Sequence, residues 1–156
     1  MVDRATLVSQ LQTARKRFAT TTSPLDESHS TFAPDPVLYT VAGHVAHTAD
    51  AIEWFVEGAF GDGWDLDLDA SIAKARAVES LAEARAWLDR AFERAISTVE
   101  GSADEELLAP IPDTRIMGGA PRAAVVHEIV DHTAHHRGSL AAYARLLGQA
   151  PPMLYS

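Results

Sequence analysis

Apolar residues recur at spacings of three and four along most of the chain, which is the period of an α-helix with one buried face. The first such segment covers about residues 3–20. Its apolar stripe consists of Leu7, Leu11, Ala14 and Phe18. A run of threonines that leads into Pro24 is expected to end this helix, because β-branched residues and proline are poor helix formers.

A second helical segment ends near Phe60, where the Gly-Asp-Gly sequence of residues 61–63 interrupts the pattern. Two positions can begin this helix. Asp35 offers an N-cap with Pro36 at the first helical position, and Thr40 offers a later cap. The pattern of the sequence leaves the choice between them open.

An acidic stretch follows, in which Asp65, Asp67 and Asp69 alternate with apolar residues. This spacing suggests a calcium-binding loop, but the segment departs from the EF-hand pattern at two positions. The sixth position would be Ala70 in place of glycine, and the twelfth would be Arg76 in place of glutamate. We therefore reject a calcium site here.

The third helix begins at Ser80, with Glu83 completing a capping box, and ends at Gly101. Its buried side is marked by apolar residues at helical spacing throughout. An earlier turn of helix is expected within about residues 72–78. This third segment therefore has both a clear start signal and a clear stop.

The fourth helix begins at Pro121 and ends before Gly148. Residues 102–120 form a long connection before it, and connections of this length are uncommon in compact domains and often line a site. Four helices with few breakers predict an all-α fold, a four-helix bundle, in a single domain covering residues 1–156. The connection before the last helix can cross the end of the bundle, so a simple up-and-down order is not required.

Composition narrows the classes of function. The chain has 156 residues, no cysteine and a formal net charge of −9, which excludes disulfides and thiolate sites and disfavours nucleic acid and anionic lipid. The densest basic run, residues 15–17, is short enough to be a solvated helix face. The most apolar long segment, residues 37–60, carries histidines and acidic residues that exclude a membrane span, and no signal-peptide pattern is present. We expect a cytoplasmic protein with neither nucleic-acid nor membrane partners.

Two of the seven histidines, His132 and His136, are four residues apart and share one face of the fourth helix. That face is otherwise apolar, and it carries Ile129, Leu140, Tyr143 and Leu147. Buried polar groups cost free energy unless they are paired, and a divalent cation would pair with both imidazoles. A core histidine that is only hydrogen-bonded is the simpler alternative, but the pair favours a metal site.

A third ligand is expected from a facing helix, where His44 and His47 are the candidates. Periodicity favours His44, because it borders the apolar centre of the second helix. His47 lies further round the helix, beside Trp54. His135 is expected at the edge of the site, since it is adjacent to His136.

The stretch DHTAHHRGSL, residues 131–140, resembles the H-x-x-H-H-R-G-Q signature in the last helix of DinB/YfiT-like proteins. The stretch TVAGHVAH, residues 40–47, resembles the start of that family's second helix, where a Ser/Thr cap precedes the ligand histidine by about two turns. The resemblance covers nearly the whole chain, because helix number and order also agree. Two departures are Ser139 in place of glutamine and Gly43 where Glu or Gln would complete a capping box.

The resemblance implies a four-helix bundle with a long crossover connection and a divalent metal ion, zinc or nickel. It implies that the ligands are His47, His132 and His136, with His44 kept as the alternative to His47. Asp50 and Trp54 then follow His47 where the family often has an acid and an aromatic residue. Family members are often dimers, so the resemblance also implies a homodimer.

Three neutral imidazoles with an open position are typical of a catalytic metal site. The resemblance implies a metal-dependent enzyme acting on a small molecule, either a hydrolase or a transferase that uses a low-molecular-weight thiol. The alternative is a non-catalytic metal- or ligand-binding bundle that serves stability, sensing or a stress response. The sequence identifies no catalytic residue beyond the metal ligands, since Asp50, Glu128 and Arg137 are interpreted as partners of ligands or as solvated charges.

Overall fold

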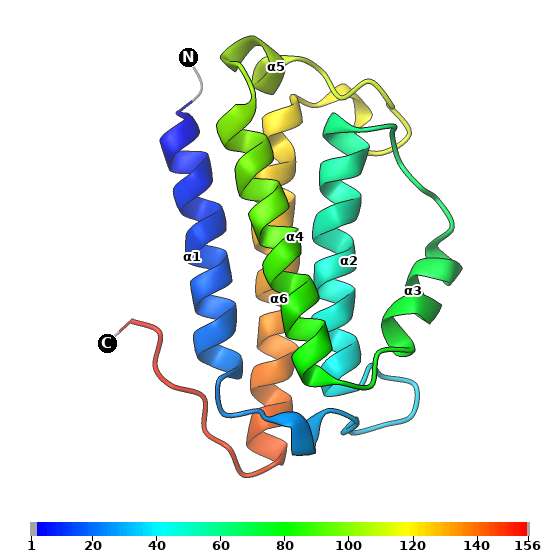
Figure 1. Ribbon diagram of the computed structural model, residues 1–156, viewed down its shortest axis with the longest axis vertical. Coiled ribbons are helices and arrows are strands. Elements are labelled where there is room, and N and C mark those ends of the chain that lie inside the picture. Colours follow the sequence, from blue (N-terminus) through cyan, green and yellow to red (C-terminus); the bar gives the residue numbers. More distant parts are fainter. Residues whose placement is uncertain (1–2, 156) are drawn as a thin grey trace.

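Helices are the only regular elements in the computed structural model, which describes residues 3–155. Four long helices form a bundle (Figure 1), namely α1 (Arg4–Thr22), α2 (Val41–Phe60), α4 (Leu81–Gly101) and α6 (Val125–Leu146). α1 and α2 each pack against both α4 and α6. The expected all-α four-helix bundle is confirmed.

The order of the helices differs from simple up-and-down alternation. In Figure 1, α1 and α6 run downward while α2 and α4 both run upward. The neighbours α2 and α4 are therefore parallel, so residues 61–80 between them must return along the whole bundle. These residues, which include α3 (Leu68–Arg76), are the long crossover.

The connection before the last helix crosses the end of the bundle, as the sequence allowed, because α4 and α6 each pack on α1 and α2 and lie diagonally across from one another. Residues 102–120 stay at one end of the bundle (Figure 1). Two backbone hydrogen bonds close this connection on itself, from Ile111 N to the carbonyl of Ala120 at 2.9 Å and from Arg122 N to that of Ala109 at 2.9 Å. These bonds satisfy backbone groups that would otherwise need hydrogen bonds from water.

Side-chain caps set the starts of three bundle helices, α1, α2 and α4. Thr40 caps α2, since its Oγ1 accepts a hydrogen bond from Gly43 N at 3.0 Å, so the later of the two candidate starts is used. Asp35 instead forms a local turn, in which its Oδ1 accepts from Val37 N at 3.0 Å. Ser80 caps α4 as expected, with its Oγ accepting from Glu83 N at 3.2 Å.

Two short helices were not fully expected. α3 begins at Leu68, ahead of the turn expected at residues 72–78, because Asp67 caps it through Ala70 N at 3.0 Å. Asp65 in turn accepts from Asp67 N at 2.9 Å, so the alternating aspartates serve the backbone of this segment. α5 (Asp104–Leu108) lies in the connection that was expected to be a loop.

The helix ends also differ by a few residues. α1 continues to Thr22 and ends two residues later than expected, because the Thr22 hydroxyl donates to the carbonyl of Phe18 at 2.9 Å and is satisfied inside the helix. The last helix starts with a 3₁₀ turn, η3 (Arg122–Ala124), and becomes α-helical only at Val125. Such differences are common at helix ends.

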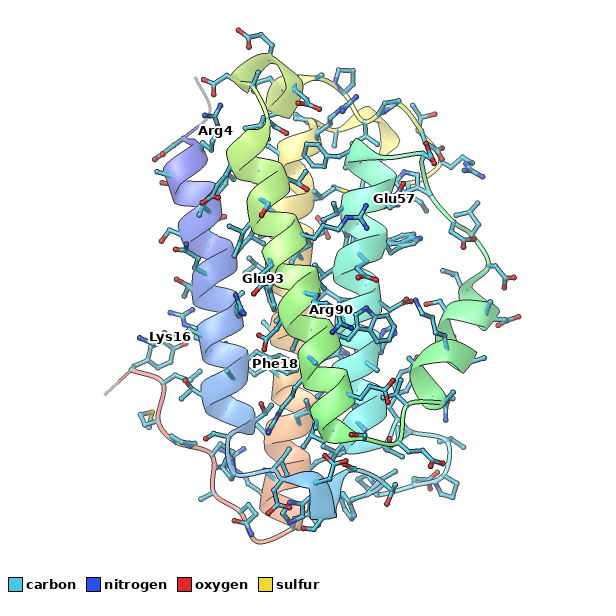
Figure 2. All side chains as sticks on the ribbon, viewed as in Figure 1. Arg4, Lys16, Phe18, Glu57, Arg90 and Glu93 are labelled. Atoms are coloured by element: carbon cyan, nitrogen blue, oxygen red, sulfur yellow. The ribbon has the colours of Figure 1, made fainter. Side chains whose placement is uncertain are left out.

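The core fills the centre of the bundle with aliphatic residues and the buried aromatic side chains of Phe18, Phe92 and Tyr143, of which Phe92 is 0% exposed. Figure 2 shows Phe18 between α1 and the neighbouring helices, whereas Lys16 lies on the outer face of α1. Arg15 beside it pairs with Asp89 at 2.9 Å, so this basic run is a solvent-facing surface. No helix within residues 3–155 is long and apolar enough to cross a membrane.

A second apolar cluster lies where the crossover leaves α2, around the buried side chain of Trp64. The Trp64 indole donates to the carbonyl of Asp113 at 2.9 Å, and Trp64 N donates to the Asp113 carboxylate at 3.0 Å. Arg115 hydrogen-bonds the same carboxylate and holds the pKa of Asp113 well below its usual range. The crossover is therefore anchored to the connection that precedes α6.

Candidate metal centre

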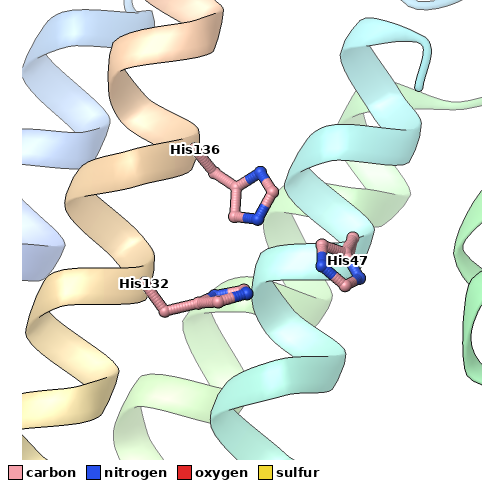
Figure 3. Close-up of side chains that lie close together, drawn as sticks. All are labelled: His47, His132 and His136. Carbon is pink, nitrogen blue, oxygen red and sulfur yellow. The ribbon is translucent and has the colours of Figure 1, made fainter. Parts of the chain in front are cut away.

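Three imidazoles from two helices meet inside the bundle (Figure 3). His47 lies in the second turn of α2, and His132 and His136 lie on adjacent turns of α6. Each offers one nitrogen, and these three nitrogens lie within 4.8 Å of one another. Ring centroids are 5.2 Å apart for His47–His132, 4.8 Å for His47–His136 and 4.5 Å for His132–His136.

The positions follow from helix geometry and packing. A spacing of four places His132 and His136 on one face of α6, next to the fully buried Ile129 and Leu140. α2 runs antiparallel beside α6, which brings His47 opposite that face. His136 is buried at 7% exposure, while His47 and His132 are half-buried.

The imidazoles of the cluster are held neutral. Burial, together with the neighbouring imidazoles, lowers the pKa of His132 to about 4 and that of His136 to about 2. Burial also lowers the pKa of His47, although the Asp50 carboxylate opposes this effect. At neutral pH each ring therefore keeps a free lone pair, which is the form that binds metals.

One atom in the cluster supports a cation directly. His132 Nδ1 is buried and has no hydrogen-bond partner among residues 3–155. A buried polar nitrogen without a partner costs free energy, and the histidines around it are the ligand type preferred by zinc and related ions. The residues present therefore fit a divalent metal ion.

His44, the alternative third ligand, lies behind the cluster. Its Nδ1 is 3.0 Å from Nδ1 of His136, and its Nε2 is 3.2 Å from the Tyr143 hydroxyl. Periodicity rightly indicated that His44 is buried, at 7% exposure. The structure brings His47, and not His44, together with His132 and His136.

Tyr39 is a neighbour of the cluster that the sequence did not reveal. Its ring stacks on His47 with centroids 4.9 Å apart, and its hydroxyl lies 3.4 Å from His47 Nδ1. A Cβ at Gly43 would come within 3.3 Å of the Tyr39 ring. Gly43, one of the two departures from the family pattern, therefore leaves space beside Tyr39 that any larger residue would reduce.

The other polar residues singled out in the sequence do not bind the imidazoles. Asp50 faces α3, where Lys74 Nζ lies 2.8 Å from its carboxylate. The Glu128 carboxylate has no hydrogen bond or ion pair within the described chain, residues 3–155. Arg137 lines a groove between α1 and α6, and His135 is exposed and contacts His136 edge to face.

A cavity of about 490 Å³ opens beside the cluster and reaches two of its imidazoles, His47 and His132. One wall is α2, including Trp54 and Phe55, and the opposite wall is the crossover with α3. The Trp54 indole donates to the carbonyl of Asp65 at 2.6 Å and ties the two walls together. The crossover lines this cavity, so the expectation that residues 102–120 line the site is wrong.

Carboxylates outnumber cations around the cavity. Its lining includes Asp50, Glu53, Glu57, Asp65 and Asp67, against Lys74 and Arg94. Both cations are already paired, Lys74 with Asp50 at 2.8 Å and Arg94 with Glu57 at 2.5 Å. The remaining three carboxylates give the cavity wall a negative potential.

Fold and site together define a class: a helical bundle with a cluster of three histidines that can hold a metal ion. The chain belongs to the DinB superfamily, which it matches over residues 10–140. The resemblance found in the sequence is thereby confirmed.

Two solved structures share the fold. A DinB-like protein from Bacillus subtilis is 18% identical, with a TM-score of 0.69 over 96% of this chain and 97% of that one. A conserved protein from Enterococcus faecalis is 20% identical, with a TM-score of 0.66 over 94% of this chain and 97% of that one. No curated protein matches the sequence. At these identities the likeness concerns the fold.

Metal binding is expected to persist to a lower pH than the sequence alone indicates. Three imidazoles of ordinary pKa, near 6.5, would lose about a thousandfold in affinity by pH 5.5, because protons compete for their lone pairs. Burial lowers these pKa values, that of His132 to about 4, so the rings stay neutral to lower pH and the loss of affinity begins at a lower pH than for exposed histidines. Equilibrium dialysis with zinc between pH 8 and 5 measures this. A loss of about a thousandfold already reached at pH 5.5, as for ordinary imidazoles, would contradict it.

Proposed function

We propose that this protein is a metal-dependent enzyme in which His47, His132 and His136 hold a divalent ion and a small molecule binds in the adjoining cavity. The observation that supports this most is that the cavity reaches two of the three imidazoles. A molecule in it can therefore contact an ion held by the cluster. Cavities of a few hundred Å³ commonly hold small ligands.

The number of ligands supports an open site. A closed structural site usually has four protein ligands, whereas catalytic sites have three. The nearest further candidates have other partners, since His44 hydrogen-bonds His136 and Asp50 pairs with Lys74. Imidazole ligands suit zinc and nickel alike, and the proposal includes either.

A divalent ion in this position supplies Lewis-acid chemistry, by polarising a substrate oxygen or by lowering the pKa of water or of a thiol. The residues of the chain bind and orient the substrate, with Trp54 and Phe55 offering an apolar surface. The reactions proposed are hydrolysis and transfer to a low-molecular-weight thiol, as the family resemblance implies. The proposal also includes a homodimer in the cytoplasm.

The test combines metal analysis with a substrate screen. Purified protein is expected to contain about one divalent ion per chain, and to turn over a member of a panel of esters, amides, and thiols with electrophiles. Turnover should disappear in His132→Ala and remain in His135→Ala, which changes an exposed neighbour. Stoichiometric metal without turnover of any substrate would instead support the non-catalytic metal-binding bundle.

The negative wall of the cavity predicts a preference among substrates. Neutral or cationic molecules are expected to bind more tightly than anionic analogues of the same size, because Glu53, Asp65 and Asp67 have no cationic partner among residues 3–155. Inhibition by a matched amine and carboxylate pair measures the preference, and Glu53→Gln should reduce it. A stronger inhibition by the carboxylate would contradict the prediction.

A further inference from the structure

A chain of hydrogen bonds extends from the cluster of three histidines into the core. Nδ1 of His136 lies 3.0 Å from Nδ1 of His44, and Nε2 of His44 lies 3.2 Å from the Tyr143 hydroxyl. That hydroxyl donates to the backbone carbonyl of Tyr39 at 3.0 Å. His44 and His136 are each 7% exposed and Tyr143 is 5% exposed, so water cannot easily replace these bonds.

The carbonyl at the end of this chain fixes the direction of every bond in it. A carbonyl oxygen only accepts, so the single hydroxyl proton of Tyr143 is directed at Tyr39. The Tyr143 oxygen must then accept from His44, which therefore carries its proton on Nε2. A neutral imidazole has one such proton, so Nδ1 of His44 accepts and Nδ1 of His136 donates.

The same reasoning determines which nitrogen of His136 is free. With its proton on Nδ1, His136 keeps the lone pair on Nε2. In Figure 3 the His136 ring extends from α6 toward the other two imidazoles. The bond to His44 holds one edge of the ring, so the opposite edge, which carries Nε2, is presented to the cluster.

We propose that His44 and Tyr143 are positioning residues, which lock His136 in the tautomer and orientation whose Nε2 binds the metal ion. The inference rests on the proposed function only where it concerns metal binding, since the tautomer of His136 is set by the protein without any ion. Hydrogen bonds to the second nitrogen of a ligand histidine commonly change metal affinity by about 10–100-fold. His44 is thus assigned a role at the site although it is not one of the three clustered histidines.

The first test compares two substitutions of one residue. His44→Leu cannot hydrogen-bond, and it is expected to weaken zinc binding by about 10–100-fold. The amide of His44→Gln can accept from His136 and donate to Tyr143, so it should restore affinity to within about threefold of the native value. Tyr143→Phe, which removes the acceptor of the His44 proton together with the hydrogen bond to the Tyr39 carbonyl, should fall between them, and His135→Ala serves as the control.

The second test needs no metal. In chelator-treated protein, imidazole ¹⁵N spectra are expected to show His136 protonated on Nδ1 and His44 protonated on Nε2. In Tyr143→Phe, His44 loses its fixed acceptor, so the spectra should show a mixture of tautomers for both rings. This measurement on the native chain decides the question even if the leucine variant does not fold.

The outcomes separate this inference from the proposed function. If the tautomers are as expected but the native protein binds no divalent ion, the positioning role stands and the metal-dependent function fails. If His136 is protonated on Nε2, the inference is overturned. Native zinc affinity in folded His44→Leu would also overturn it, even though metal binding itself would remain.

Discussion

Replacing His132 and His136 together by alanine is expected to abolish divalent metal binding while leaving the helical content unchanged. Two of the three clustered imidazoles are lost, and His47 alone on α2 cannot retain an ion. We expect more than about a hundredfold loss of zinc affinity, beyond what changes around a ligand usually cause. Metal analysis after dialysis measures the loss, and circular dichroism verifies the fold.

The matched control is a double replacement of His127 and His135 on the same helix, since both side chains are exposed and outside the cluster. This variant should bind zinc like the native protein. Among single replacements, His47→Ala should cost more affinity than His44→Ala, because His47 is a proposed ligand and His44 acts through His136. Full metal content in the His132→Ala, His136→Ala protein would show that the ion is held elsewhere.

Gly58→Ala is expected to destabilise the fold by about 1–3 kcal/mol, opposite in sign to its effect on helix propensity. A Cβ at position 58 of α2 would overlap the indole ring of Trp64, closer than real Cβ atoms come to any neighbour. The ring is 3% exposed and bound to the Asp113 carbonyl, so it cannot swing aside. Chemical unfolding measures the difference in the free energy of unfolding.

Gly138→Ala provides the comparison for this prediction. Position 138 lies within α6, and an added Cβ there meets no atom within 4 Å. The higher helix propensity of alanine is then the main effect, and we expect this variant to be more stable than the native protein by up to about 1 kcal/mol. If both alanine variants were stabilised, the close packing of Trp64 on α2 would be wrong.

The pair His132 and His136 could be identified from the sequence because a local rule places it. A spacing of four puts both rings on one face of a helix, and the apolar residues around them show that this face is buried. Tyr143 lies on the same stripe, two turns after His136. Its hydrogen-bond partners are His44 on α2 and Tyr39 just before α2. No local pattern in the sequence could show these contacts between distant segments.

The third member of the cluster could not be chosen from periodicity. Both His44 and His47 lie on the side of α2 that faces α6, and His44 is the more buried of the two. Burial, however, does not tell which side chain reaches a given point on a facing helix. That depends on the axial offset between α2 and α6, and the offset places His47 beside His132 and His136. The family resemblance, which carries this register, indicated His47.

The location of the crossover could not be predicted from the sequence either. Residues 61–80 and residues 102–120 are connections of nearly equal length, and either can span the bundle. Only the packing of α2 beside a parallel α4 decides that the first one does. The walls of the cavity follow from this choice, because the crossover and α3 lie over the open side of the histidine cluster.

The sequence by itself determined the helices, most of their caps and the histidine pair, since each of these depends on residues within one or two turns. The tertiary structure decided the direction of the helices, the identity of the third clustered histidine and the hydrogen bonds behind His136. Those features depend on how separate helices are offset and packed against one another. Such offsets result from the shape of the whole core, which no single segment of the chain encodes.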